Sequence, residues 1–159
     1  MSYEKLPIAP LPTPYKHGVS VIDGKWRSRI LAVINYYTAL RYTELRDALR
    51  PISDTVLANQ LRLLIDDSVV VKVELDDASV CYTLTEKGKG LIPILRMLAQ
   101  WSQQWGYNAP KPEAMDPKTR IPTNPFRTSQ AGVRRASMMF SGMDEDEVIK
   151  GFPLVNNDN

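Results

Sequence analysis

The stretch from Leu40 to Asp66, LRYTELRDALRPISDTVLANQLRLLID, predicts two short helices joined by a tight turn. In the first helix, Leu45, Ala48 and Leu49 are spaced to form one inner face. Thr43 is placed to cap the N-terminus of that helix, because a threonine oxygen can accept from the free backbone N–H groups there.

Pro51 marks the turn between the two helices, because a proline disfavours the helical conformation of the residue before it. Ser53 can then cap the second helix. Asp54 falls in the first turn, where the positive end of the helix dipole favours a carboxylate. Together these signals place the start of the second helix at residues 53–54.

The second helix has two different faces. Its apolar side has the spacing i, i+4, i+7 and i+8 and consists of Leu57, Leu61, Leu64 and Ile65. The opposite side is small and polar, ends in a cation, and consists of Thr55, Ala58, Asn59 and Arg62. Such side chains suit base edges in the major groove of DNA, where asparagine pairs with adenine and arginine with guanine. A helix face that is merely solvated would look the same, so this stripe alone leaves both interpretations open.

Composition sets bounds on the function. The 159 residues allow one domain with a buried core and an appendage, and the net charge of +2 permits nucleic acid as a partner without requiring it. One cysteine excludes an internal disulfide, and one cysteine with one histidine argues against a zinc site, so we expect no cofactor. We find neither a signal peptide nor a membrane span, and therefore expect a cytoplasmic protein.

A helix opening at Gly24-Lys25-Trp26 precedes the two-helix stretch. Its buried face is predicted to consist of Trp26, Ile30, Val33, Ile34 and Tyr37. Lys25 and Arg29 lie one turn apart on another face. They could hold a DNA phosphate or simply keep the helix soluble, and the sequence favours neither.

A β-hairpin follows the second helix. Residues 69–75 form a β-branched run, residues 76–79 a polar turn, and residues 80–84 an alternating run. A short extended piece at residues 40–42 can supply a third strand. The order helix, strand, helix, helix, hairpin predicts an α+β, mostly helical fold: a winged helix-turn-helix with a small three-stranded sheet. This order strengthens the DNA interpretation.

A long helix, capped by Thr85, is predicted to run to about Trp105. One face of it has nearly heptad spacing and consists of Leu91, Ile94, Leu95, Leu98, Trp101 and Trp105. So small a domain cannot cover that face, so we expect a second copy to cover it in a homodimer. The alternative is that the helix folds back on its own domain.

Several motifs occur together at specific spacing between about residues 13 and 105. They are Gly24-Lys25-Trp26; residues 41–45 (RYTEL); Ile52-Ser53 with Leu57, Leu61 and Leu64; residues 82–88 (YTLTEKG); and residues 91–93 (LIP) with Leu98 and Trp101. This set resembles the HxlR-type winged helix-turn-helix regulators, relatives of the MarR group. The resemblance implies a dimeric DNA-binding regulator with the second helix of the turn motif in the major groove.

The chain departs from this family pattern in three places, one of which is that Asn59-Gln60 is less basic than many recognition helices, which predicts weaker binding. Where many relatives carry a Cys-Pro pair that senses oxidants or electrophiles, this chain has Thr13-Pro14, so the usual thiol switch is absent. The only cysteine, Cys81, falls in the second hairpin strand, without a visible positive setting that would activate it. The hairpin tip, Asp76-Asp77, is acidic and would be repelled by phosphate, which puts contacts between the wing and DNA in question.

We expect three segments: a proline-rich arm at residues 1–16, a winged-helix DNA-binding and dimerisation domain at residues 17–105, and a flexible extension at residues 106–159. The extension could instead serve as a protein-docking segment. No phosphate loop, metal cluster or credible nucleophile set supports an enzyme.

The sequence thus favours a homodimeric repressor on a palindromic operator, with the two second helices about 34 Å apart. Base contacts are expected from Thr55, Ala58, Asn59 and Arg62, and backbone contacts from Lys25, Arg29, Thr43, Ser53 and Lys72. The alternative is a winged-helix interaction module that has lost DNA binding. The sequence does not identify an effector molecule.

Overall fold

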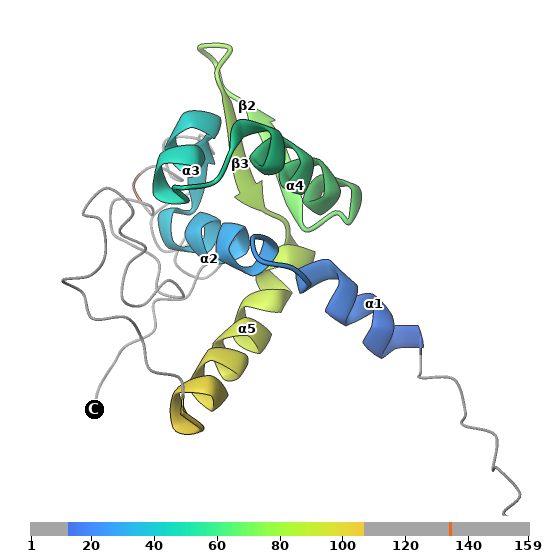
Figure 1. Ribbon diagram of the computed structural model, residues 1–159. Helices are drawn as coiled ribbons and strands as arrows, with labels where there is room; N and C mark the ends of the chain where they lie inside the picture. Colours follow the sequence, from blue (N-terminus) through green and yellow to red (C-terminus); the bar gives the residue numbers. More distant parts are fainter. Residues whose placement is uncertain (1–12, 107–133, 135–159) are drawn as a thin grey trace, which may run out of the picture.

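The computed structural model describes residues 13–106 and Arg134. The elements, in chain order, are α1 (Thr13–Ile22), α2 (Arg27–Tyr37), β1 (Ala39–Arg41), α3 (Tyr42–Ala48), α4 (Asp54–Asp66), β2 (Val70–Glu74), β3 (Val80–Leu84) and α5 (Glu86–Gln104). This is the mostly helical α+β winged helix-turn-helix that the sequence predicts (Figure 1). Residues 1–12 of the predicted arm, and the predicted extension from residue 107 onward apart from Arg134, lie outside the described residues.

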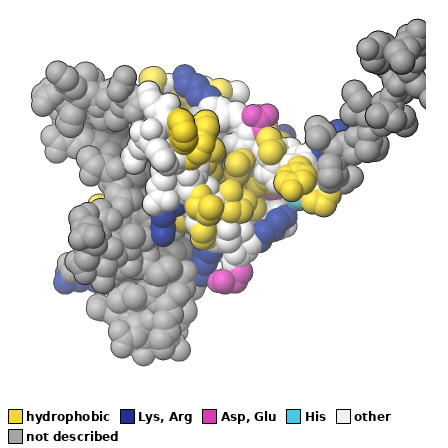
Figure 2. All heavy atoms as spheres, turned by 90° about the horizontal axis from the view of Figure 1, so that it is seen from below, with side chains coloured by type: hydrophobic (Ala, Val, Ile, Leu, Met, Phe, Trp, Pro, Cys, Tyr) yellow, Lys and Arg dark blue, Asp and Glu magenta, His cyan; other side chains and the backbone are white. Residues whose placement is uncertain are grey.

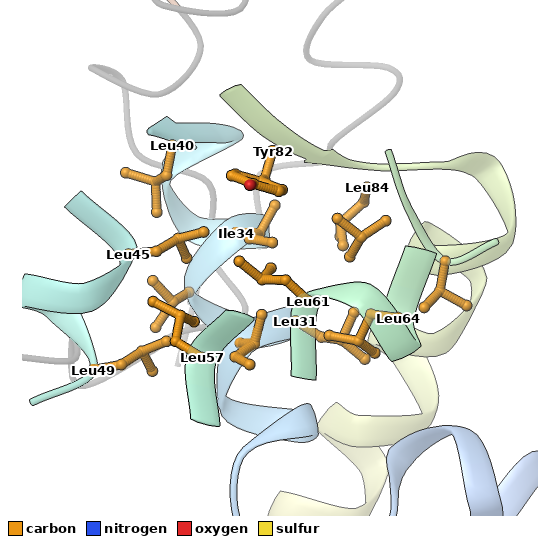
Figure 3. Packing of buried hydrophobic residues seen from close by; sticks show 14 of the residues in the cluster. Leu31, Ile34, Leu40, Leu45, Leu49, Leu57, Leu61, Leu64, Tyr82 and Leu84 are labelled. Carbon is orange, nitrogen blue, oxygen red and sulfur yellow. The ribbon is translucent and has the colours of Figure 1, made fainter. Parts of the chain in front are cut away.

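Helix α2 supplies the centre of the core. Its side chains Ile30, Leu31, Val33 and Ile34 have no exposed surface. Figure 3 shows Leu31 and Ile34 of α2 among residues of α4 and β3, including Leu61 of α4 and Tyr82 of β3. One helix therefore packs against both the turn motif and the sheet.

Helix α3 begins earlier than the sequence predicts. Arg41, the last residue of β1, occupies the N-cap position, and Thr43 lies inside the first turn, so the prediction of a Thr43 cap is wrong. The backbone N–H of Arg41 donates to the Glu44 carboxylate at 2.8 Å. Glu44 thus reaches back to satisfy an N–H group at the helix start, which lets the strand lead directly into the helix.

Helix α4 has the start and the two faces that the sequence predicts. The Ser53 hydroxyl accepts from the backbone N–H of Val56 at 3.3 Å, which confirms the cap. On the inner face Leu57, Leu61 and Leu64 are buried, and Ile65 is partly buried at the edge of the core.

The three strands form an antiparallel sheet in the order β1-β3-β2. Tyr82 in the central strand is paired with Leu40 on one side and with Lys72 on the other. The turn joining β2 to β3 is closed by a hydrogen bond from the N–H of Leu75 to the carbonyl oxygen of Ser79, at 2.8 Å. The predicted hairpin and third strand are therefore confirmed.

The first described helix, α1, corrects the predicted boundary of the N-terminal arm. Residues 13–16, expected to lack regular structure, belong to this helix. Pro14 is compatible with a helix there because the N–H groups of a first turn have no partner within the helix. At the other end of α1, Val21 is buried and Ile22 packs against the core.

Helix α5 begins at the cap that the sequence predicts, since the Thr85 hydroxyl accepts from the backbone N–H of Gly88 at 3.0 Å. The helix continues through Pro93, and Ile92 and Leu95 face the core. Among residues 13–106, no helix is both long and apolar enough to cross a bilayer.

Two glycines of α5 provide a matched test of this packing. A Cβ atom on Gly88 would overlap the carbonyl oxygen of Val69, whereas a Cβ on Gly90 would meet nothing within 4 Å. We expect Gly88→Ala to lower the free energy of unfolding by about 1 to 3 kcal/mol, since backbone must move to make room. Gly90→Ala should raise it by about 0.5 to 1 kcal/mol through helix propensity. Urea denaturation measures both, and equal effects of the two substitutions would contradict this packing.

Candidate nucleic-acid interface

The outer face of α4 is open to solvent. Thr55, Ala58, Asn59 and Arg62 are all exposed, so the structure brings the four predicted base-contacting residues together on one surface. Burial of the opposite stripe fixes this orientation of the helix. The face can therefore be presented to a partner without any rearrangement of the core.

Arg62 is held in place on this face. Its Nη1 atom lies 3.2 Å from Oδ2 of Asp66, and its Nη2 atom donates to Oδ1 of Asn59 at 3.0 Å. Asn59 and Arg62 were predicted from the sequence, whereas Asp66 was not. The sequence does contain a signal for this ion pair, because Arg62 and Asp66 have i, i+4 spacing on one helix.

The N-terminal end of α4 is tied to α3. The Tyr42 hydroxyl donates to the backbone carbonyl of Asp54 at 2.9 Å and lies 3.3 Å from its carboxylate. Burial, followed by the charge of Asp54, raises the pKa of Tyr42 above its usual value. Two of the predicted backbone contacts, Thr43 and Ser53, are exposed at the starts of α3 and α4.

Two arginines that the sequence analysis did not name lie near this end of the turn motif. Arg46 Nη1 is 3.6 Å from the Asp54 carboxylate, and Arg50 Nη2 is 2.8 Å from the Asp47 carboxylate. The hydrogen bond from Arg50 lowers the pKa of Asp47. Arg46 and Arg50 are both partly solvent-accessible and can add positive charge beside α4.

The other predicted phosphate contacts lie against aromatic rings. The Lys25 ammonium lies 5.0 Å from the ring centroid of Trp26, and the Arg29 guanidinium 5.6 Å from it. Both cations thus sit at the start of α2, stacked on one ring and still exposed. Lys72 on β2 is exposed and lies 5.9 Å from the ring of Tyr82.

The wing tip has an internal charge pair. Asp77 accepts from the backbone N–H of Ser79 at 2.9 Å and from its hydroxyl, and lies 3.4 Å from the Arg41 guanidinium. The hydrogen bonds from Ser79 are the main reason that the pKa of Asp77 is lowered, with a smaller contribution from Arg41. Asp77 is therefore a stable carboxylate that partly offsets a cation at the end of β1.

The C-terminal end of α4 is anchored to α2 and α5, and the α2 residue that holds it also binds α1. Arg27 Nη1 donates to the carbonyl oxygen of Ser20 at 2.6 Å and lies 3.4 Å from the carboxylate of Asp67, the C-cap of α4. Lys87 of α5 donates to the carbonyl oxygen of Asp67 at 2.8 Å. Arg27 is 16% exposed, so this contact is better shielded from solvent than the ion pairs on the outer face.

One face of α5 remains uncovered. Its exposed residues and their exposed fractions are Ile94 (53%), Met97 (68%), Leu98 (51%), Trp101 (59%) and Trp105 (70%). Figure 2 shows hydrophobic side chains gathered on the side of the molecule seen from below. Met97 was not among the predicted interface residues. Two predicted ones differ: Leu95 is buried in its own core, and Leu91 is partly buried against it, because the N-terminal half of α5 packs on α2.

A family model described as HxlR-like helix-turn-helix matches residues 21–110. The chain belongs to this family. The match includes both helices of the turn motif, the hairpin and the whole of α5. The resemblance found in the sequence is thereby confirmed.

Several relatives of this chain carry names of transcriptional regulators. The chain is 30% identical to the HTH-type transcriptional regulator YdzF of Bacillus subtilis (strain 168), over 58% of this chain and 87% of the relative. It is 33% identical to an HTH-type transcriptional regulator of Methanothermobacter thermautotrophicus, over 55% of this chain and 68% of the relative. The chain is thus a transcriptional regulator of the helix-turn-helix type.

Solved structures of regulators have the same fold. A MarR-family transcriptional regulator from Enterococcus faecalis V583 has a TM-score of 0.55 at 27% identity, over 64% of this chain and 93% of that one. The oxidised form of the redox regulator HypR has a TM-score of 0.50 at 28% identity, over 60% of this chain and 99% of that one.

The one cysteine of this chain lies in the core. Cys81 is 2% exposed within β3. A thiol reacts readily when it is accessible and has a positive setting, and burial in an apolar core opposes both. Within the described residues, no group of three or more His, Cys, Asp or Glu side chains could hold a metal ion.

The Arg27 contact provides a test of how α4 is anchored. We expect Arg27→Met to lower the free energy of unfolding by about 1 to 3 kcal/mol, because it leaves Asp67 and a helix-terminal carbonyl without a charged partner. Arg29→Met, which removes an exposed cation over Trp26, should cost at most about 1 kcal/mol. Urea denaturation compares the two variants. A loss that is no larger for Arg27→Met than for Arg29→Met would contradict the anchoring role.

Proposed function

We propose that this protein is a cytoplasmic, homodimeric repressor that binds a specific operator by inserting α4 into the major groove. The observation that carries the proposal is the geometry of α4. Its inner face is buried, its two ends are held by Tyr42 and Arg27, and its outer face is exposed. A helix held in this way on a helix-turn-helix can enter a groove as a rigid body.

The residue types on the outer face fit base edges. Thr55 and Ala58 can contact a thymine methyl group, while Asn59 and Arg62 supply hydrogen-bond donors. The groups proposed to contact the DNA backbone are Lys25, Arg29, Thr43, Ser53 and Lys72, and the positions of Arg46 and Arg50 add them to this set. Backbone contacts position the protein on DNA, and base contacts select the sequence.

The uncovered face of α5 is the basis for the homodimer. Four of the predicted interface residues remain exposed there: Ile94, Leu98, Trp101 and Trp105. Met97 extends the same apolar face, and Tyr15 and Val19 of α1 are exposed apolar residues as well. A contiguous apolar surface of this kind marks an interaction site, and pairing with an identical surface gives two-fold symmetry. Two-fold symmetry requires a palindromic operator, with half-sites about 34 Å apart.

The acidic wing tip favours a repressor that relies on α4 rather than on the wing. Asp76 and Asp77 would repel phosphate, and Arg41 is already paired with Asp77. A dimer bound over a promoter would exclude polymerase from it, which favours repression as the outcome of binding.

The alternative is a winged-helix module that has lost DNA binding and uses its surfaces to hold a protein. The observation that favours it is the pairing of several surface arginines with carboxylates, which reduces the positive charge available to phosphate. Retained dimerisation together with absent affinity for duplex DNA would distinguish this module from the repressor.

Arg62 provides the mutational test of the DNA surface. Arg62→Ala should weaken operator binding about 5- to 150-fold, since a good arginine–base contact contributes about 1 to 3 kcal/mol. The thermal midpoint should be unchanged, because the Arg62 side chain is 64% exposed. Fluorescence anisotropy with a labelled operator duplex measures the affinity. Lys89→Ala, which removes a cation from α5, serves as the control and should change the affinity less than about twofold. Equal affinities of wild type and Arg62→Ala would remove Arg62 from the interface.

Leu98 provides the test of the dimer. Leu98→Glu should convert the dimer to a folded monomer, because it places a charge in the proposed apolar contact. Val71→Glu, at a similarly exposed apolar residue of β2, should leave the dimer intact. Analytical ultracentrifugation measures both masses. A wild-type monomer, or a dimer that survives Leu98→Glu, would contradict the proposed interface.

A further inference from the structure

Three polar side chains on the outer face of α4 form one connected unit, which we call the Asn59–Arg62–Asp66 triad. The Arg62 guanidinium lies at its centre, with Nη2 on the Asn59 amide oxygen at 3.0 Å and Nη1 on the Asp66 carboxylate at 3.2 Å. The side chains of Arg62 and Asp66 are 64% and 59% exposed. The triad therefore faces solvent on the surface that is proposed to meet DNA.

The position of Asp66 argues against a role in stabilising the helix. Asp66 is the last residue of α4, where the negative end of the helix dipole disfavours a carboxylate. The pair also has the less favourable order for a helix, with the cation N-terminal to the anion. Asp66 instead orients the side chain of Arg62.

The chemistry of arginine fixes the orientation of the Asn59 amide. A guanidinium has no acceptor, so the atom of Asn59 that faces Nη2 must be the amide oxygen. One acceptor position of that oxygen is then used, and the amide NH2 group points away from Arg62 to meet a partner. Arg62 likewise has N–H groups left over after two contacts, because it carries five. Toward DNA, Arg62 and the Asn59 amide NH2 group present donors, while the amide oxygen and one Asp66 carboxylate oxygen each accept from Arg62.

We propose that Asp66 is a specificity-determining positioning residue, and that the triad selects guanine in the operator. This inference rests on the proposed function, since it assigns a base to the α4 surface. Guanine presents two acceptors, O6 and N7, in the major groove, whereas adenine presents one acceptor and one donor. The N–H groups left on Arg62 match the two acceptors of guanine. The adenine pairing expected for Asn59 would need a second hydrogen bond to the amide oxygen that already accepts from Arg62.

Asp66 has a second effect, on the charge of the surface. Paired with a carboxylate, Arg62 adds little net positive charge, and non-specific binding depends on charge toward phosphate. Its N–H groups remain available to a base edge. Asp66 thus reduces attraction to any sequence while keeping Arg62 in position for the correct one.

The experiment is a selection from a random duplex pool with the full-length wild type, Asp66→Asn and Asp76→Asn. The affinities for the selected duplex, for a G-to-A variant of it and for a scrambled duplex are then measured. In the wild type each half-site should carry a fixed guanine, and its replacement by adenine or 7-deazaguanine should weaken binding about fivefold or more. In Asp66→Asn this preference should fall to about twofold or less, while affinity for the scrambled duplex rises about two- to fivefold.

Asp76→Asn is the matched control, because it removes the same charge from the wing tip without touching the triad. It should raise affinity for the scrambled duplex in the same way but keep the guanine preference. Asp66→Glu, which retains the carboxylate, should restore most of the preference. The thermal midpoint of Asp66→Asn should not fall, so a lost preference cannot be attributed to unfolding.

The outcomes separate this inference from the proposed function. A wild-type protein that selects a sequence whose guanine preference persists in Asp66→Asn overturns the role of Asp66 and leaves the repressor in place. A selected sequence without a fixed guanine overturns the assignment of the base. A wild type that binds operator and scrambled duplexes equally overturns both.

Discussion

Burial of Leu57, Leu61 and Leu64 is the constraint on which the rest of this structure depends. These three side chains fix the rotation of α4 against the core around α2, and the rotation decides which residues of α4 reach solvent. A rotation of one position would bury polar groups without partners, at a cost of several kcal/mol. The outer face of the helix is therefore set by the apolar face, and so is the position of any group that could meet DNA.

Local signals in the sequence were sufficient for most of the fold. The caps at Ser53 and Thr85, the two faces of α4 and the hairpin all depend on residues close together in the chain, and they are found as predicted. The errors concern choices that depend on neighbours or on competing local groups. Glu44 rather than Thr43 satisfies the start of α3, and Leu95 turns to the core because α2 lies beside it. The helical spacing of Asn59, Arg62 and Asp66 makes contacts among them possible, but only the side-chain positions show that Arg62 binds both of the others.

Charge on the proposed DNA surface is balanced rather than strongly positive. Arg41, Arg46 and Arg62 each lie within ion-pair distance of a carboxylate, and the whole chain has a net charge of only +2. Exposed ion pairs of this kind are weak, about 0 to 1 kcal/mol each, so phosphate can replace the carboxylate when the fit is good. The consequence is a surface with modest attraction for DNA in general, whose selectivity comes from the shape and donors of α4. The balanced charge of this surface and the exposed apolar face of α5 are consistent with the proposed dimer, in which each subunit binds DNA weakly but specifically.

The most direct measurement is fluorescence anisotropy of the full-length protein against a duplex from upstream of its own gene and against a scrambled duplex, over a salt series. A sequence-specific regulator should bind the first duplex much more tightly, by about 1000-fold or more, with an affinity that falls steeply as salt rises. Weak binding, equal for both duplexes even at low salt, would contradict the account and favour the interaction module.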